Sequence, residues 1–185
     1  MKELSLNILD IAENSVKAEA TLTEILIEEN DETLTLTFKD DGYGMSEDTV
    51  KSVVNPFYTT RTTRSVGLGI PLLKLEAEQT GGNFSITSTH KEADSKNHGT
   101  KVTAVFYKNH LDFTPLGDAT QSVVTLIQGH PDTDFLFKHS YNEKQVLLDT
   151  RELRAELEGV PLNTYEVIKW VEAYLYEQYQ DLYNK

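Results

Sequence analysis

The most constraining feature of the sequence is the stretch 33–39, in which apolar and polar side chains alternate without interruption. Leu and Phe occupy its even-numbered positions, whereas Thr and Lys occupy the odd-numbered ones. Because successive side chains of a strand point to opposite faces, this pattern predicts a strand with one buried face. Residues 22–29, rich in Ile, Leu and Thr, predict a second strand, and the polar residues 30–32 join the two as a hairpin turn. A sheet with one apolar face must be covered by another layer.

Residues 4–18 are expected to form that covering layer. Their apolar side chains recur at helical spacing, whereas polar residues, among them Asn7, Asp10, Asn14 and Lys17, fall on the other side of the helix. The pattern predicts an amphipathic helix whose apolar face packs on the hairpin and whose polar face, with Asn7 in it, is turned away from the core.

Turn residues, caps and periodicity predict the remaining elements. Up to residue 107 these are a short helix capped by Ser46, a helix from Gly67 to Thr80, and strands at 83–88 and 100–107. After residue 107 they are a helix capped by Asp118, strands at 134–141 and 144–149, and helices near 150–158 and 164–182, the last with a capping box made by Asn163 and Glu166.

The order of these elements predicts an α+β two-layer sandwich. We expect a mixed, mostly antiparallel sheet that helices cover on one face. The pattern restarts after residue 107, so we place a main domain at residues 1–109 and a small C-terminal α/β extension at residues 110–185, built from a helix, a β-hairpin and two helices. The apolar stripe of the last helix must pack on the main domain or on a partner.

Charge and composition exclude several functional classes. The net charge is −13, from 17 basic and 30 acidic side chains, and it repels phosphate backbones and anionic lipid headgroups. We therefore expect no nucleic acid partner and no membrane partner. The lack of cysteine excludes disulfides and thiolate chemistry. No apolar run approaches the roughly 20 residues that span a bilayer, so we expect a cytoplasmic protein.

Three polar residues of the first predicted helix have types that suit phosphate chemistry. Asp10, Asn14 and Lys17 are four and three positions apart, so they share one helix face. An Asn amide oxygen is a ligand for Mg²⁺, a Lys ammonium attracts a phosphate, and an Asp carboxylate can act as a general base. A polar helix face is ordinarily only solvated, so the trio gains meaning only beside other motifs.

Two glycine motifs complete the candidate pocket. Asp40 to Met45 leave a predicted strand through Gly42 and Gly44, which let a flat ligand approach the backbone, while a fixed carboxylate there can accept a hydrogen bond from an exocyclic amine. Gly67-Leu68-Gly69 opens a predicted helix and offers free N–H groups to an anion. The first motif alone is also compatible with a plain Asp-Gly turn, and the second alone is weak evidence for an anion site.

The order and spacing of these pieces resemble the GHKL ATPases, a family that includes gyrase, the ninety-kilodalton heat-shock chaperones, histidine kinases and the MutL mismatch-repair proteins. The matching segments are Leu9 to Ser15 (N box), Asp40 to Gly44 (first glycine box), Pro56-Phe57 (F box), Gly67 to Gly69 (second glycine box) and Gly99-Thr100.

The resemblance implies an ATP-binding sandwich with ATP and Mg²⁺ as cofactors. Asn14 would hold Mg²⁺ through the ATP phosphates, Asp40 would bind the adenine amine, and residues 55–66 would form a lid. The implied binding residues are Asn14, Lys17, Asp40, Gly42, Gly44, Met45, Phe57, Arg61, Arg64, Gly67, Leu68, Gly69 and Thr100. Arg61 and Arg64 either clamp the γ-phosphate or belong to a solvated loop.

Departures from the family pattern leave the branch of the family open. Asp10 stands where ATPases and serine kinases usually carry Glu and histidine kinases commonly carry Asn, which favours hydrolysis or transfer to a hydroxyl. Lys17 instead resembles the histidine kinases. Ser65 replaces a glycine that usually opens the second glycine box. The chain starts at the N box, so we expect no dimerising hairpin with a phosphoacceptor histidine upstream of it.

The sequence therefore predicts an Mg-ATP-binding protein that hydrolyses or transfers the γ-phosphate, with Asp10 as the catalytic base. A histidine-kinase-like or anti-sigma-factor-like regulator that acts in trans on a phosphoacceptor protein is one form of this hypothesis. The alternative is a nucleotide-gated protein-binding module with little turnover, which the unmatched segment 110–185 favours. The five histidines lack metal spacing, and we expect a surface or packing role for His139 in its predicted strand.

Overall fold

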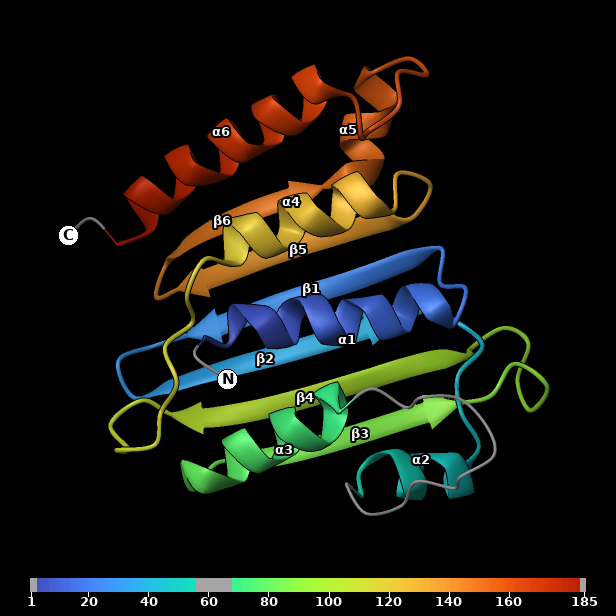
Figure 1. Cartoon of the computed structure of the whole chain (residues 1–185), viewed down its shortest axis with the longest axis vertical. Coiled ribbons are helices and arrows are strands. Elements are labelled where there is room, and N and C mark those ends of the chain that lie inside the picture. Colours follow the sequence, from blue (N-terminus) through green and yellow to red (C-terminus); the bar gives the residue numbers. More distant parts are fainter. Residues whose placement is uncertain (1–2, 56–67, 184–185) are drawn as a thin grey trace.

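The computed structural model describes residues 3–55 and 68–183 and places all strands in one six-stranded sheet of order β3-β4-β2-β1-β5-β6 (Figure 1). The strands are β1 (Leu22–Glu29), β2 (Thr33–Asp40), β3 (Asn83–Thr89), β4 (Gly99–Tyr107), β5 (Asp134–Tyr141) and β6 (Lys144–Asp149). The helices are α1 (Ser5–Lys17), α2 (Glu47–Val53), α3 (Gly69–Gln79), α4 (Ala119–Gly129), α5 (Thr150–Glu156) and α6 (Tyr165–Leu182).

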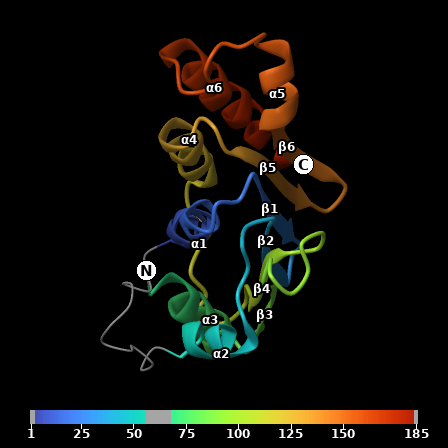
Figure 2. The ribbon, with the colours of Figure 1, turned by 90° about the vertical axis from the view of Figure 1, so that its right-hand side faces the viewer.

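The expected two-layer sandwich is confirmed. Helices α1, α3 and α4 lie on one face of the sheet (Figure 2), and the pairing is antiparallel except between β1 and β5, which run parallel. The alternating stretch in β2 turns Leu34, Leu36 and Phe38 into the core, as predicted. No helix in residues 3–55 and 68–183 combines the length and apolar character needed to cross a bilayer.

Asn7 is fully buried, so its predicted place on an outward polar face is wrong. Helix α1 lies between α3 and α4 (Figure 1), and both of its flanks are therefore covered in addition to the face on the sheet. The Asn7 amide nitrogen donates to the Glu76 carboxylate of α3 at 2.6 Å. The prediction for Asn7 failed because an amphipathic pattern assumes that a helix packs on one layer only. Helix α1 instead has neighbours on three sides.

The capping box expected from Asn163 and Glu166 is also wrong. Helix α6 begins after Thr164, and no side-chain hydrogen bond caps it. The preceding turn is fixed by the fully buried Leu162 and by a bond from the Thr164 N–H to the Pro161 carbonyl at 3.2 Å, so Asn163 is left exposed one residue too early to cap. The caps predicted from Ser46 and Asp118 are confirmed, because each accepts a backbone N–H three residues on.

The C-terminal segment continues the sheet of the N-terminal segment. Strand β5 pairs with β1 along its whole length, from Leu22 opposite Asp134 to Glu29 opposite Tyr141. Helix α6 packs on β6 and α4, which covers its apolar stripe. The amide of Gln178 also bonds to both backbone groups of Leu147, at 3.0 and 3.2 Å, as a neighbouring strand would. The division into units at residues 109 and 110 stays a prediction.

A polar network around Glu29 joins the two segments at one end of the sheet. One carboxylate oxygen lies 2.6 Å from the Lys108 ammonium, and the other lies 3.0 Å from both His139 Nε2 and the Tyr183 hydroxyl. The fully buried His139 ring also contacts the Tyr179 hydroxyl, 3.0 Å from Nδ1. His139 thus has the packing role expected of it. Although burial opposes the charge, hydrogen bonds from His139, Lys108 and Tyr183 lower the pKa of Glu29 to about 2.

A Glu29→Gln variant is expected to unfold with a free energy lower by about 2 kcal/mol at pH 7, because charged hydrogen bonds are replaced by weaker neutral ones. The folded pKa of about 2 lies below the unfolded value of 4.5, so the contribution is complete above pH 4.5 and is lost as the pH falls toward 2. Urea unfolding at pH 7 and at about pH 3 measures this. The exposed neighbour variant Glu28→Gln is the control, and an equal, pH-independent loss in both variants would contradict the prediction.

Candidate functional site

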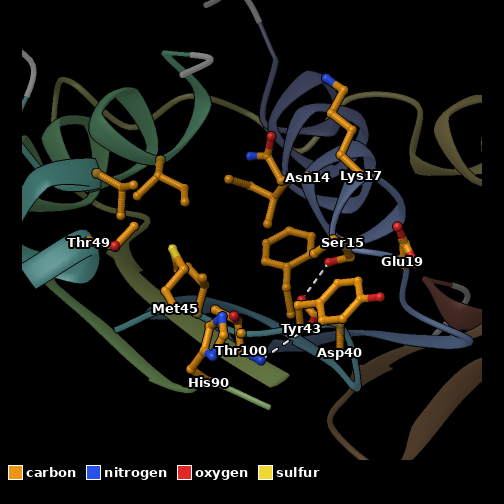
Figure 3. Close-up of a pocket in the computed structure, with 17 residues that line it drawn as sticks. Asn14, Ser15, Lys17, Glu19, Asp40, Tyr43, Met45, Thr49, His90 and Thr100 are labelled. Atoms are coloured by element: carbon orange, nitrogen blue, oxygen red, sulfur yellow. Dashed lines mark hydrogen bonds between the residues drawn. The ribbon is translucent and has the colours of Figure 1, made fainter. Parts of the chain in front are cut away.

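A cavity of about 490 Å³ opens between α1, the end of β2 and the start of β4, with α2 and the first turn of α3 at its far side (Figure 3). Its walls are apolar and its ends are polar. The apolar walls come from Ile11, Ala18, Phe38, Val53, Ile70 and Val102. The other lining residues are Asn14, Ser15, Lys17, Glu19, Asp40, Tyr43, Gly44, Met45, Thr49, His90 and Thr100. This volume lies in the range of small-molecule and cofactor sites.

Asp40, the last residue of β2, is the buried carboxylate of this cavity. Its Oδ1 accepts hydrogen bonds from the backbone N–H groups of Gly42 at 3.0 Å and Thr100 at 3.2 Å. Its Oδ2 accepts from the Ser15 hydroxyl of α1 at 2.8 Å (Figure 3). Three donors from three segments therefore fix both the position and the orientation of the carboxylate.

The Asp40 carboxylate can accept one more hydrogen bond than the protein gives it. Burial raises the pKa of the Asp40 carboxyl above its usual value, and the bonds from Ser15, Gly42 and Thr100 oppose that rise. A carboxylate has about four acceptor positions, and the protein occupies all but one of them. The remaining position can receive one N–H from a ligand in the cavity.

Asp41 has a different task, although it stands next to Asp40 in the sequence. Its Oδ1 accepts from the backbone N–H groups of Thr21 at 2.8 Å and Leu22 at 2.9 Å, and its Oδ2 accepts from the Thr21 hydroxyl. These bonds hold the turn between α1 and β1. Asp41 is thus a structural residue outside the cavity lining, and the pair of aspartates divides into one ligand-facing and one turn-holding carboxylate.

The glycines after Asp40 permit a backbone approach that side chains would prevent. Gly44 has φ +67°, and a Cβ built there would lie 1.9 Å from the Thr89 carbonyl oxygen. A Cβ at Gly42 would lie 2.7 Å from the Ala18 carbonyl oxygen, which itself accepts the Tyr43 N–H at 2.8 Å. The loop of residues 41–45 therefore packs closely against the end of α1 on one side and against β3 on the other.

Helix α1 brings two of its three predicted polar residues to the cavity. Asn14 and Lys17 line it, with the Asn14 amide toward the interior and the Lys17 ammonium away from Asp40 (Figure 3). Asp10 does not line it. It lies beside Gly69 at the start of α3, where an added Cβ would be 3.1 Å from the Asp10 Cβ and 3.8 Å from a carboxylate oxygen. Asp10 therefore faces the N-terminus of α3, whose free N–H groups attract anions.

The predicted residues thus fall into three groups. Those that line the cavity are Asn14, Lys17, Asp40, Gly44, Met45 and Thr100, and those that adjoin it through Asp40 or the start of α3 are Asp10, Gly42, Leu68 and Gly69. Phe57, Arg61, Arg64 and Gly67 lie outside the described residues. The role of each residue stays a prediction.

Sequence reasoning missed the residues that hold Asp40 and its neighbours in place. Ser15 belongs to the N box, but no contact was predicted for its side chain, and its hydroxyl donates to Asp40. His98 lies with Nδ1 2.6 Å from the Gly42 carbonyl oxygen, and Ser88 bonds to the Met45 N–H at 2.8 Å. Serines and histidines in loops and strands are common, so the sequence carries no signal that singles these out.

The residues that line the cavity are chemically suited to a magnesium nucleotide. Apolar walls suit a base, and the buried acceptor Asp40 suits an exocyclic amine. Within residues 3–55 and 68–183, no group of at least three His, Asp or Glu side chains is placed to hold a metal. A single amide such as that of Asn14 nevertheless suits Mg²⁺, which takes most of its ligands from phosphates and water.

Known proteins are similar to this chain in sequence. The profile of a family described as histidine kinase-, DNA gyrase B-, and HSP90-like ATPase matches residues 2–110. The heme sensor protein HssS of Staphylococcus saprophyticus subsp. saprophyticus is 33% identical over 98 residues, which are 51% of this chain and 20% of that protein. The chain therefore matches only a fifth of the length of this curated relative.

Solved structures are similar in fold. The N-terminal domain of a DNA repair protein aligns with a TM-score of 0.55 at 17% identity, over 80% of this chain and 53% of that one. The MutL ATPase domain of Aquifex aeolicus, complexed with ADP, aligns with a TM-score of 0.52 at 17% identity, over 85% of this chain and 68% of that one.

Proposed function

Because the matching profile spans residues 2–110, this chain belongs to the histidine kinase-, DNA gyrase B- and HSP90-like ATPases, and we propose that its ATP-binding domain binds Mg-ATP in the cavity beside Asp40 and hydrolyses or transfers the γ-phosphate. In this proposal the base lies between the apolar walls, the Asp40 carboxylate accepts a hydrogen bond from the adenine amine, and the phosphates extend along α1 toward the start of α3.

The observation that carries the proposal is the setting of Asp40. A buried carboxylate costs free energy unless donors satisfy it, and here three protein donors leave one acceptor position toward a cavity large enough for a base. The MutL domain that is similar in fold was solved with ADP, which agrees with a nucleotide as the ligand.

In this proposal, residues of α1 contact the phosphates of the bound nucleotide. Bound Mg²⁺ neutralises phosphate charge, and the Asn14 amide is the protein group suited to hold it. Lys17 adds positive charge at the rim. We assign to Asp10, which lies beside Gly69 at the start of α3, the role of orienting or deprotonating an attacking hydroxyl or water.

Incubation of the full chain with γ-labelled ATP and Mg²⁺, with and without host lysate, tests this function. Release of free phosphate by the chain alone indicates an ATPase, and a labelled lysate protein indicates a kinase that acts in trans. Calorimetric ATP binding without either product would support a nucleotide-gated binding module instead. No detectable ATP binding would contradict the proposal as a whole.

An Asn14→Ala variant is expected to bind Mg-ATP about tenfold more weakly, because the metal loses its protein ligand. The same variant should bind ATP in excess EDTA as the wild type does, since the base contacts at Asp40 are untouched. Calorimetry under both conditions measures the two affinities. An equal Mg-ATP affinity in variant and wild type would remove Asn14 from this role.

A further inference from the structure

Ser88 of β3 does not line the cavity but contacts two residues that do. Its hydroxyl accepts a hydrogen bond from the Met45 N–H at 2.8 Å and donates to the Gly99 carbonyl at 3.0 Å. It also lies 2.8 Å from the hydroxyl of Thr100, the residue opposite it in the β3–β4 register. One side chain therefore connects the loop that carries Met45 with the strand that carries Thr100.

The number of hydrogens determines the direction of the bond between Ser88 and Thr100. A hydroxyl has one hydrogen and two lone pairs. The Ser88 hydrogen is directed to the Gly99 carbonyl, so the contact with Thr100 requires the Thr100 hydroxyl to be the donor. The N–H of Met45 and the O–H of Thr100 then occupy both lone pairs of Ser88.

This direction makes Thr100 an acceptor toward the cavity. Its only hydrogen is committed to Ser88, so its oxygen offers lone pairs alone to a ligand. The neighbouring Asp40 carboxylate, which accepts the Thr100 N–H at 3.2 Å, is an acceptor as well. Asp40 and Thr100 together form what we call the polar floor of the cavity. Because this floor presents only acceptors, it favours a ligand group that donates hydrogen bonds, and it opposes a carbonyl oxygen.

We propose that Ser88 is a positioning residue that sets base specificity: by holding the Thr100 hydroxyl as its donor, it makes the cavity floor select a 6-amino purine over a 6-oxo purine. This inference rests on the proposed function, namely that a purine nucleotide occupies this cavity. It assigns part of the selectivity to a residue outside the cavity, in addition to the direct contact expected of Asp40.

The test compares ATP with inosine triphosphate, whose base carries a 6-oxo group in place of the amine. Calorimetry on the full chain gives the ratio of the two affinities. Ser88→Ala frees the Thr100 hydrogen to turn toward the ligand, so the ATP preference should fall about tenfold. Thr100→Val should lower it similarly, and adding Ser88→Ala to Thr100→Val should have no further effect, because Ser88 acts through Thr100.

Two more variants separate specificity from folding. Ser88→Thr keeps the hydroxyl and should keep the ratio, whereas Ser88→Cys keeps the volume but accepts hydrogen bonds poorly and should lower it. A Ser88→Ala or Ser88→Cys variant that weakens both nucleotides equally would show a merely structural role and overturn the inference, as would additive losses in the double variant. A wild type that binds neither nucleotide would overturn the proposed function itself.

Discussion

An Asp40→Asn variant is expected to bind ATP at least about 100-fold more weakly than the wild type. The Asn side-chain oxygen can still accept the N–H groups of Gly42 and Thr100, which places the new NH₂ group at the position of Oδ2. One hydrogen of this group then points to the Ser15 oxygen and the other points into the cavity, so a donor opposes the adenine amine where an acceptor stood before. Calorimetric titration with ATP measures the loss.

The loss of binding by Asp40→Asn should not come from unfolding. Burial raises the pKa of the Asp40 carboxyl, which means that its charge is held at a cost in the folded chain, and a neutral amide of the same shape removes that cost. The thermal midpoint of the variant should therefore equal or exceed that of the wild type.

The adjacent Asp41→Asn variant is the matched control for Asp40→Asn. It should keep the ATP affinity within about threefold but lower the unfolding free energy by about 1–2 kcal/mol, because the turn between α1 and β1 loses charged acceptors for Thr21 and Leu22. If both variants lost binding equally, Asp40 would have no special part in holding the base.

An Asp10→Asn variant is expected to lower the rate of ATP turnover by about 100-fold or more while leaving the ATP affinity within about threefold. The amide keeps the shape that packs beside Gly69 but cannot take a proton. Single-turnover measurement with γ-labelled ATP separates the chemical step from binding.

Asp10→Glu is the companion variant for Asp10→Asn. It keeps a carboxylate and adds reach, so it should retain turnover within about tenfold. An unchanged rate in Asp10→Asn would exclude Asp10 as the base, and a wild-type rate no higher than that of Asp10→Asn would favour the nucleotide-gated binding module.

Local patterns in the sequence predicted the elements of this fold well. The alternation in 33–39 identified the face of β2 that is buried, and the caps at Ser46 and Asp118 located two helix starts. The burial of Asn7 was not predictable in this way, because it depends on α3 and α4 packing on both flanks of α1. Likewise, a parallel pair between β1 and β5 joins segments about a hundred residues apart, and no turn signal announces it.

The candidate site was predictable in its motifs but not in its connections. Neighbouring aspartates at 40 and 41 look alike in the sequence, and only the folded chain separates the one that faces the cavity from the one that holds a turn. Ser15 and Ser88 matter through hydrogen bonds to residues far away in the sequence, which periodicity does not report. Asp10 lies beside Gly69 of the second glycine box, a contact between two motifs that the sequence alone does not report.

The parallel pairing between β1 and β5 determines which fragments of this chain can be studied in isolation. A fragment that ended near residue 109 would leave one full edge of β1 unpaired along Leu22–Glu29, and it would uncover the core side chains that α4 and β5 now bury. Such an edge is a template for self-association. We therefore expect excised halves of the molecule to self-associate, so measurements on the nucleotide site are best made with both segments present.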